Sequence, residues 1–281
     1  MIAERLSRAG IRVSIVTNGL QVDDATVEQM VAAGVSGVSV SLDGLEPVHN
    51  RIRVASTRPK RASSSFESAV RALGCVVASP LRSAVITHIN RWNLPHLEQM
   101  HALLVELGVE VWQVQLAYPY GRLLEIREPY LIDPKQLPEL AAQLANFARQ
   151  DKLRLVVADS IGYYGPHEPL LRRSMDGRRT FWMGCMAGCL GVAVCSNGDV
   201  KGCPTHPPEF VVGNVRKERF ADIWADRSRF AYNTEWREEL LQGECARCTY
   251  RRVCRAGCTS TAYAVTGSIY DNPYCLQRGQ A

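Results

Sequence analysis

The chain has 281 residues, of which 46% are hydrophobic and 22% are charged, and its formal net charge at pH 7 is +5. This composition is that of an ordinary globular protein and excludes a disordered or collagen-like chain. The basic residues are scattered, with no stripe interleaved with aromatic residues, so we expect no nucleic-acid partner. No apolar run reaches the roughly 18 to 20 residues of a membrane span, and the amino terminus has no apolar signal core. We therefore expect no membrane association and a cytoplasmic, reducing location.

Short β-branched runs alternate with amphipathic helical patterns from residue 1 to about residue 160. This order predicts an α/β fold of about four strand–helix units, with right-handed crossovers and a parallel sheet. The predicted strands are Ile11–Val16, Val35–Leu42, Arg82–Ile89 and Val109–Ala117, and the predicted helices are Asp24–Ala33, Phe66–Leu73, Leu94–Leu107 and Pro134–Arg149.

Three loops follow the carboxyl ends of these strands, where parallel α/β folds collect their chemistry. They are TNGL (Thr17–Leu20), SLDGLEP (Ser41–Pro47) and AYPYGR (Ala117–Arg122). Asn-Gly and Asp-Gly are also ordinary turn dipeptides, so a purely local turn role remains the alternative for the first two loops.

Cysteine is concentrated near the carboxyl terminus, since nine of the ten cysteines fall between Cys185 and Cys275. In a reducing compartment, clustered thiols bind metal more often than they form disulfides. We predict a separate cysteine-rich domain over residues 185–281, joined to the α/β domain of residues 1–160 by a linker over residues 161–184. Within it, Asn197-Gly198 predicts a tight hairpin between two short strands.

The stretch CARCTYRRVCRAGC, Cys245–Cys258, has the spacing C-x2-C-x5-C-x3-C, and Cys275 follows after sixteen residues. A C-x2-C turn allows two thiolates to bind one centre. Cys254 and Cys258 are four positions apart, which predicts that they lie on one face of a helix.

Eight thiolates are enough for two four-thiolate centres. The eight are Cys185, Cys189, Cys203, Cys245, Cys248, Cys254, Cys258 and Cys275. Cys75 and Cys195 remain, and we expect both to be small buried hydrophobic residues. Four thiolates suit zinc or an iron–sulfur cluster, and spacing alone leaves both possibilities open.

The cysteine pattern, from Cys185 through Gly198-x4-Cys203 and C-x2-C-x5-C-x3-C to Cys275, resembles the SPASM domain of radical S-adenosylmethionine (radical SAM) enzymes. GNVRKERFADIW (Gly213–Trp224) resembles the segment that links the two cysteine groups in that domain. GIRVSIVTNG (Gly10–Gly19) and VSVSLDGLEPVHNRIR (Val38–Arg53) resemble the third and fourth strand–loop units of the radical SAM partial (β/α)6 barrel.

This resemblance implies two auxiliary [4Fe–4S] clusters with interleaved ligands. The first cluster would take Cys185, Cys203 and Cys258, with Cys189 as the expected fourth ligand, and the second would take Cys245, Cys248, Cys254 and Cys275. The resemblance also places four residues around S-adenosylmethionine and substrate: Thr17, Asn18, Ser41 and Asp43. Capping of the following helix is an equally simple role for Ser41 or Asp43. No catalytic residue is assigned.

Two family motifs are absent from the 281 residues, namely the C-x3-C-x2-C ligands of the catalytic cluster and a Gly-Gly-Glu loop. We therefore expect about two βα units to be missing upstream, which would leave the Ile11–Val16 strand as an exposed edge. Binding of S-adenosylmethionine and a third [4Fe–4S] cluster is expected only if that part is supplied. Sulfatase-maturing relatives carry an Asp directly after the Gly-x4-Cys cysteine, whereas this chain has Pro204. His206 nearby is expected to be a solvated loop residue.

The expected function is that of an oxidoreductase-type maturase, which oxidatively modifies a ribosomally made peptide by 5′-deoxyadenosyl radical chemistry, with a ferredoxin or flavodoxin-type electron donor. One alternative is a non-catalytic iron–sulfur electron-transfer or scaffold subunit. The other is a zinc-stabilised binding module.

Overall fold

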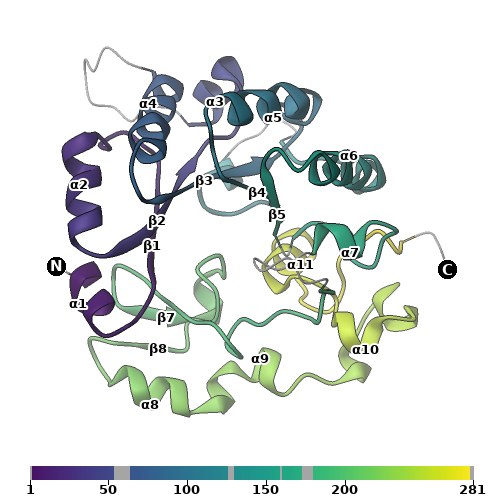
Figure 1. Cartoon of the computed structure of the whole chain (residues 1–281). Coiled ribbons are helices and arrows are strands. Elements are labelled where there is room, and N and C mark those ends of the chain that lie inside the picture. Colours follow the sequence, from purple (N-terminus) through teal and green to yellow (C-terminus); the bar gives the residue numbers. More distant parts are fainter. Residues whose placement is uncertain (1, 54–63, 126–129, 159, 173–179, 279–281) are drawn as a thin grey trace. The chain divides into compact units, whose positions relative to one another are not determined.

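The computed structural model describes residues 2–53, 64–125, 130–158, 160–172 and 180–278 (Figure 1). The chain divides into two compact units. The first contains Met1–Ala117, Tyr130–Ile132 and Ala142–Ala158, and the second contains Tyr118–Pro129, Asp133–Ala141 and Asp159–Ala281. Residues 173–179 of the expected linker lie outside the described residues.

The first unit is built on a five-stranded sheet whose strands follow one another in chain order and are all parallel (Figure 1). The strands are β1 (Val13–Thr17), β2 (Val35–Ser41), β3 (Arg82–Ile89), β4 (Val111–Leu116) and β5 (Arg154–Val157). The predicted α/β fold with a parallel sheet is confirmed. Strand β5 was not predicted, because four residues are too few to show a period. Strand β1 forms an edge of the sheet, and its Val16 side chain is 63% exposed.

Helices precede or connect these strands. They are α1 (Ile2–Arg8), α2 (Asp24–Ala32), α3 (Glu46–Ile52), α4 (Ser65–Val77), α5 (Leu97–Glu106) and α6 (Leu137–Gln150). Helix α4 contacts both β2 and β3 and buries an apolar face that includes Leu73 and Val76. Its start is fixed by a capping box, in which the Ser64 hydroxyl accepts from the Glu67 amide and the Glu67 carboxylate accepts from the Ser64 amide.

The register of the sheet separates an apolar face from a polar one. Val40, Val85 and Trp112 are aligned across three strands and are fully buried. On the opposite face, the strands carry Ser41, Gln113, and the aligned pair His88 and Gln115. Because side chains alternate along a strand, the same segments can pack against helices on one side and present polar groups on the other.

The second unit holds a small antiparallel sheet and several short helices. The strands are β6 (Ala193–Val194), β7 (Asp199–Lys201) and β8 (Gly213–Asn214), and the helices are α7 (Glu168–Leu171), α8 (Phe220–Ala225), α9 (Ala231–Thr234), α10 (Arg251–Cys254) and α11 (Thr259–Thr266). The predicted hairpin at Asn197-Gly198 is confirmed: Gly198 has a φ of 92°, and its amide donates to the Cys195 carbonyl at 2.9 Å. Among the described residues, every helix is too short or too polar to cross a lipid bilayer.

The prediction that Cys254 and Cys258 share a helical face is wrong. Helix α10 ends at Cys254, and Cys258 is the residue that precedes α11. The three residues between them, Arg255, Ala256 and Gly257, all have left-handed backbones, with φ values of 55°, 60° and 73°. The left-handed run ends the helix, and the Gly257 amide closes a turn by donating to the Cys254 carbonyl at 3.0 Å, so the two cysteines do not lie on one helical face.

Candidate functional site

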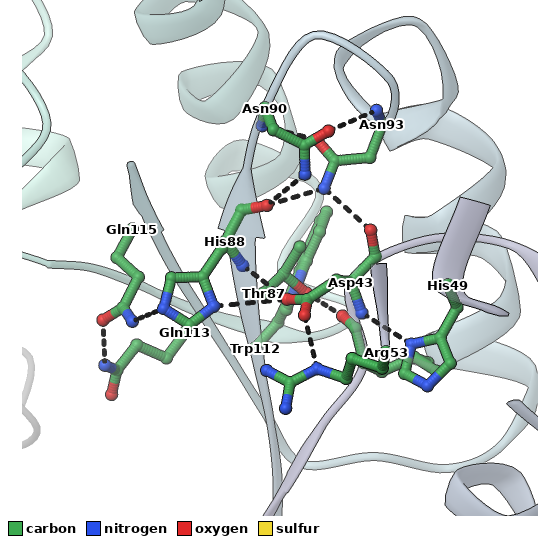
Figure 2. A network of polar contacts seen from close by, with 11 residues as sticks. Asp43, His49, Arg53, Thr87, His88, Asn90, Asn93, Trp112, Gln113 and Gln115 are labelled. Atoms are coloured by element: carbon green, nitrogen blue, oxygen red, sulfur yellow. Dashed lines mark hydrogen bonds and ion pairs between the residues drawn. The ribbon is translucent and has the colours of Figure 1, made fainter. Parts of the chain in front are cut away.

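A buried polar network occupies the carboxyl ends of β2, β3 and β4 in the first unit, with Asp43 at its centre (Figure 2). One Asp43 oxygen accepts from Arg53 Nε at 2.5 Å, and the other accepts from the His88 amide at 2.8 Å. Burial raises the pKa of Asp43, but the hydrogen bond from His88 and the charge of Arg53 outweigh it and lower the pKa to about 2. Asp43 is therefore an ionised carboxylate whose two oxygens are both engaged by the protein.

His49 on helix α3 is held in its neutral form. Its Nδ1 accepts from the Asp43 amide at 3.0 Å, so the ring proton resides on Nε2, which lies 3.2 Å from the Ser65 hydroxyl. Burial lowers the pKa of His49 to about 4, with the charge of Arg53 contributing and that of Asp43 opposing.

His88, near the end of β3, connects Asp43 to the polar face of the sheet (Figure 2). Its Nδ1 lies 3.4 Å from Asp43 Oδ1, and its Nε2 lies 2.7 Å from the Gln115 side-chain nitrogen. Gln115 in turn accepts from Gln113 at 3.4 Å. If the Gln115 amide donates to Nε2, the His88 proton resides on Nδ1 and faces the carboxylate. Because its side chain is 34% exposed, His88 is accessible to a bound molecule.

Two asparagines in the loop after β3 close the network. Asn93 donates to the Asp43 carbonyl at 2.8 Å and to the His88 carbonyl at 2.7 Å. Asn90 donates to the same His88 carbonyl at 2.9 Å. Sequence reasoning missed Arg53, His88 and both asparagines as functional candidates. The signal that could have found Asn90 is its position directly after a predicted strand, at the same edge of the sheet as Asp43.

The four residues predicted to contact S-adenosylmethionine lie at the ends of two adjacent strands, because Thr17 on β1 is aligned with Val40 on β2. The Thr17 hydroxyl accepts from the Gly19 amide at 3.1 Å, and the Asn18 side-chain oxygen Oδ1 accepts from the Leu20 amide at 3.2 Å. Both side chains therefore serve the local turn. Ser41 is buried at the end of β2. Contacts of these residues with a cofactor remain predictions.

Four cysteines of the second unit line one cavity of about 110 Å³. They are Cys245, Cys248, Cys254 and Cys275. Burial raises the pKa of Cys245 to about 11, and it raises the pKa of Cys275 as well. Without a cation these thiols stay protonated, so a metal centre must displace their protons when it binds. Among the described residues, no three His, Cys, Asp or Glu side chains lie together in a way that could bind a single metal ion. The four cysteines instead line a cavity.

The other four cysteines share neighbours in the same unit. Cys203 Sγ lies 3.1 Å from the Thr205 hydroxyl, which lies 2.8 Å from the hydroxyl of Ser260, two residues after Cys258. Tyr232 lies near Cys185 and Cys189. Burial raises the pKa of this tyrosine, and the thiols of Cys185, Cys203 and Cys189 add to the increase.

Two expectations about single residues of this unit are wrong. His206 is fully buried and packs against Phe210, with ring centroids 4.7 Å apart. Its loop folds inward because Lys201 Nζ donates to the carbonyls of Pro204 and His206. Cys195, like Cys75 in the first unit, is half-buried rather than buried.

Comparisons with known proteins agree with this architecture. Residues 185–249 match the SPASM family, described as an iron–sulfur cluster-binding domain. The chain is 27% identical over 286 residues to the AdoMet-dependent heme synthase of Methanosarcina barkeri, with 99% of this chain and 78% of that protein covered. It is 28% identical over 280 residues to the PqqA peptide cyclase of Xanthomonas campestris, with 95% and 66% covered.

A solved structure, native anSMEcpe with bound AdoMet and Cp18Cys peptide, superposes with a TM-score of 0.62 at 18% identity, covering 94% of this chain and 71% of that one. The parallel sheet and the cysteine-rich unit thus define a protein with a radical SAM-type fold and a SPASM extension. The chain is a radical SAM protein with a SPASM domain.

Proposed function

We propose that the chain binds two auxiliary [4Fe–4S] clusters through its eight clustered cysteines. The observation that carries this proposal is the cavity lined by Cys245, Cys248, Cys254 and Cys275, in a chain that matches an iron–sulfur cluster-binding domain. Four thiolates are the donor set that such clusters require. The other cluster is assigned to Cys185, Cys189, Cys203 and Cys258. When bound, these clusters supply electron acceptance or relay.

The carboxyl end of the parallel sheet is the proposed site for S-adenosylmethionine and substrate. Its polar face and the Asp43 network offer hydrogen-bonding groups for the ribose, amine and carboxylate groups of these molecules. Within it, His88 is the proposed substrate contact, because its partly exposed ring is held by a buried carboxylate at 3.4 Å. The domain boundaries that follow are residues 1–160 for the partial barrel, 161–184 for the linker and 185–281 for the SPASM domain.

The proposed substrate is a ribosomally made peptide that undergoes an oxidative modification, with a ferredoxin or flavodoxin-type protein as electron donor. The similarity to a peptide cyclase and to a structure with bound peptide supports this class. A haem precursor is the second candidate, because the heme synthase of M. barkeri aligns with 99% of this chain. Mass spectrometry distinguishes the two: an oxidised peptide loses two hydrogens, whereas the peptide is unchanged if the substrate is a tetrapyrrole.

Metal analysis tests the clusters. Anaerobic purification should yield about eight irons and eight sulfides per chain, since two [4Fe–4S] clusters are expected. Cys258→Ala should remove the first cluster and spare the second, and Cys248→Ala should do the reverse. Colourless protein that contains zinc would refute the iron–sulfur proposal and favour the zinc-stabilised module.

Turnover separates an enzyme from a scaffold subunit. The chain is incubated with S-adenosylmethionine and dithionite, alone and with the translated product of the DNA upstream of Met1. Formation of 5′-deoxyadenosine in either case supports the enzyme. Its absence in both, with clusters present, favours the electron-transfer or scaffold subunit.

A further inference from the structure

Two aromatic side chains of the second unit hydrogen-bond to the main chain of cysteines assigned to different clusters. The Cys258 amide donates to the Tyr163 hydroxyl at 2.7 Å. The Trp182 indole Nε1 donates to the Cys254 carbonyl at 3.1 Å. The two rings are buried, with exposures of 1% and 6%, and their centroids lie 5.1 Å apart.

A buried ion pair, Glu168 and Arg172, hydrogen-bonds to the main chain at or next to both aromatic residues. Glu168 accepts from the Trp182 amide at 3.0 Å and from the Tyr164 amide at 3.2 Å. Arg172, whose Nε lies 3.5 Å from Glu168, donates through Nη2 to the carbonyls of Ile161 and Gly162, both at 2.8 Å. The ion pair therefore anchors the segment before Tyr163 and the residue Trp182 to the short helix α7 and its C-cap residue.

The chain reversal between the two cysteines is packed directly against Tyr163. A Cβ atom on Gly257 would lie 2.3 Å from the Tyr163 ring, and the φ of Gly257 is 73°. Glycine is required here for both reasons, the close approach and the left-handed backbone. The ring thus contacts the main chain at Gly257 while its hydroxyl contacts the next amide.

We propose that Tyr163 and Trp182 are positioning residues, one for each proposed cluster: Tyr163 sets the main chain of Cys258 in the first, and Trp182 sets that of Cys254 in the second. The inference rests on the proposed cluster binding. Groups that orient a metal ligand tune the centre, because they control the direction of the ligand and the polar groups around its sulfur. The Glu168–Arg172 pair acts on both clusters through these two side chains.

Two conservative variants test the assignment. Tyr163→Phe keeps the ring that packs on Gly257 and removes the hydroxyl. Cluster-loaded protein is reduced stepwise, and electron paramagnetic resonance follows each cluster, with the signals assigned by their loss in Cys258→Ala or Cys248→Ala. Tyr163→Phe should shift the midpoint potential and g values of the signal that Cys258→Ala removes, and leave the other signal unchanged. Trp182→Phe should give the opposite selectivity.

Tyr263→Phe is the matched control, because it removes a phenol hydroxyl from a ring that packs edge-on against Phe210 in the same unit, at 5.1 Å between centroids. It should move neither signal. Circular dichroism of each variant checks the fold. Unchanged signals in Tyr163→Phe, or equal shifts of both signals, would overturn the positioning roles while iron content still supports the clusters. Absence of iron from the unsubstituted chain would instead refute the proposed function.

Discussion

Protonation of His49 should make the first unit sensitive to mild acid, and His49→Asn should remove that sensitivity. The folded protein holds His49 neutral, with its pKa lowered from 6.5 to about 4 by burial. Asn can still offer an oxygen near the position of Nδ1 to the Asp43 amide, but it does not titrate. The groups that face the ring are Asp43 and Arg53 from the loops and Ser65 and Phe66 from α4.

The direction follows from proton linkage. Above pH 6.5 His49 is neutral in the folded and the unfolded chain, so it contributes no pH dependence. Below pH 6.5 His49 is protonated in the unfolded chain but stays neutral in the folded chain. The free energy of unfolding therefore falls until the pH reaches about 4, where the folded chain also binds the proton. Each pKa unit corresponds to about 1.4 kcal/mol, which predicts a loss of about 2 kcal/mol between pH 7.5 and pH 5.

Urea unfolding of both proteins, followed by far-ultraviolet circular dichroism, measures this loss. Asn at position 49 lowers stability at every pH, so the informative quantity is the difference between the two pH profiles. His101 and His206, whose pKa values burial also lowers, contribute equally to both proteins and cancel. His96→Asn, at a half-buried position before α5, serves as the control and should keep the acid sensitivity. Parallel pH profiles for the unsubstituted protein and His49→Asn would refute the buried neutral histidine.

Three further substitutions have defined outcomes. Asp43→Asn should lower the free energy of unfolding by about 3 kcal/mol in urea titrations, because Arg53 loses its buried carboxylate; a change below about 1 kcal/mol would show that the pair is not formed. Gly257→Ala should cost about 2 kcal/mol, measured as a lower Tm, because alanine is strained at this φ and meets the Tyr163 ring; an unchanged Tm would contradict the close contact. Trp112→Phe should cost about 2 kcal/mol in urea titrations, because Thr87 loses an indole donor at 2.9 Å and a void remains; no loss would contradict that buried bond.

Much of the fold follows from sequence patterns because its strands are separated by long periodic helices. The strand Arg82–Ile89 was predicted with the bounds that the structure has, since a run rich in β-branched residues is a strand signal. Helix α3 was missed because it follows a turn and covers only seven residues. The reversal after Cys254 was missed because helical spacing does not reveal that Arg255 and Ala256 adopt left-handed backbones.

The candidate sites were predictable to different degrees. The cysteine groups could be predicted from their spacing, because ligands of one metal centre lie close together in the sequence or are brought together by a hairpin. The Asp43 network was not visible, because it joins residues 45 to 50 positions apart, as in the bonds from His88 and Asn93. The burial of His206 could not be predicted, because it involves a hydrogen bond from Lys201 to the His206 carbonyl. No local sequence pattern indicates that bond.

The left-handed run of Arg255, Ala256 and Gly257 has a consequence for the order in which metal enters the protein. Only three residues separate a ligand of one proposed cluster from a ligand of the other, and all three have left-handed backbones. Assembly of either cluster therefore removes much of the main-chain freedom of the other, whose ordering then costs less entropy. Since such coupling is reciprocal, each cluster should raise the affinity for its neighbour, so Cys258→Ala and Cys248→Ala should each keep the remaining cluster but bind it more weakly than the unsubstituted chain does.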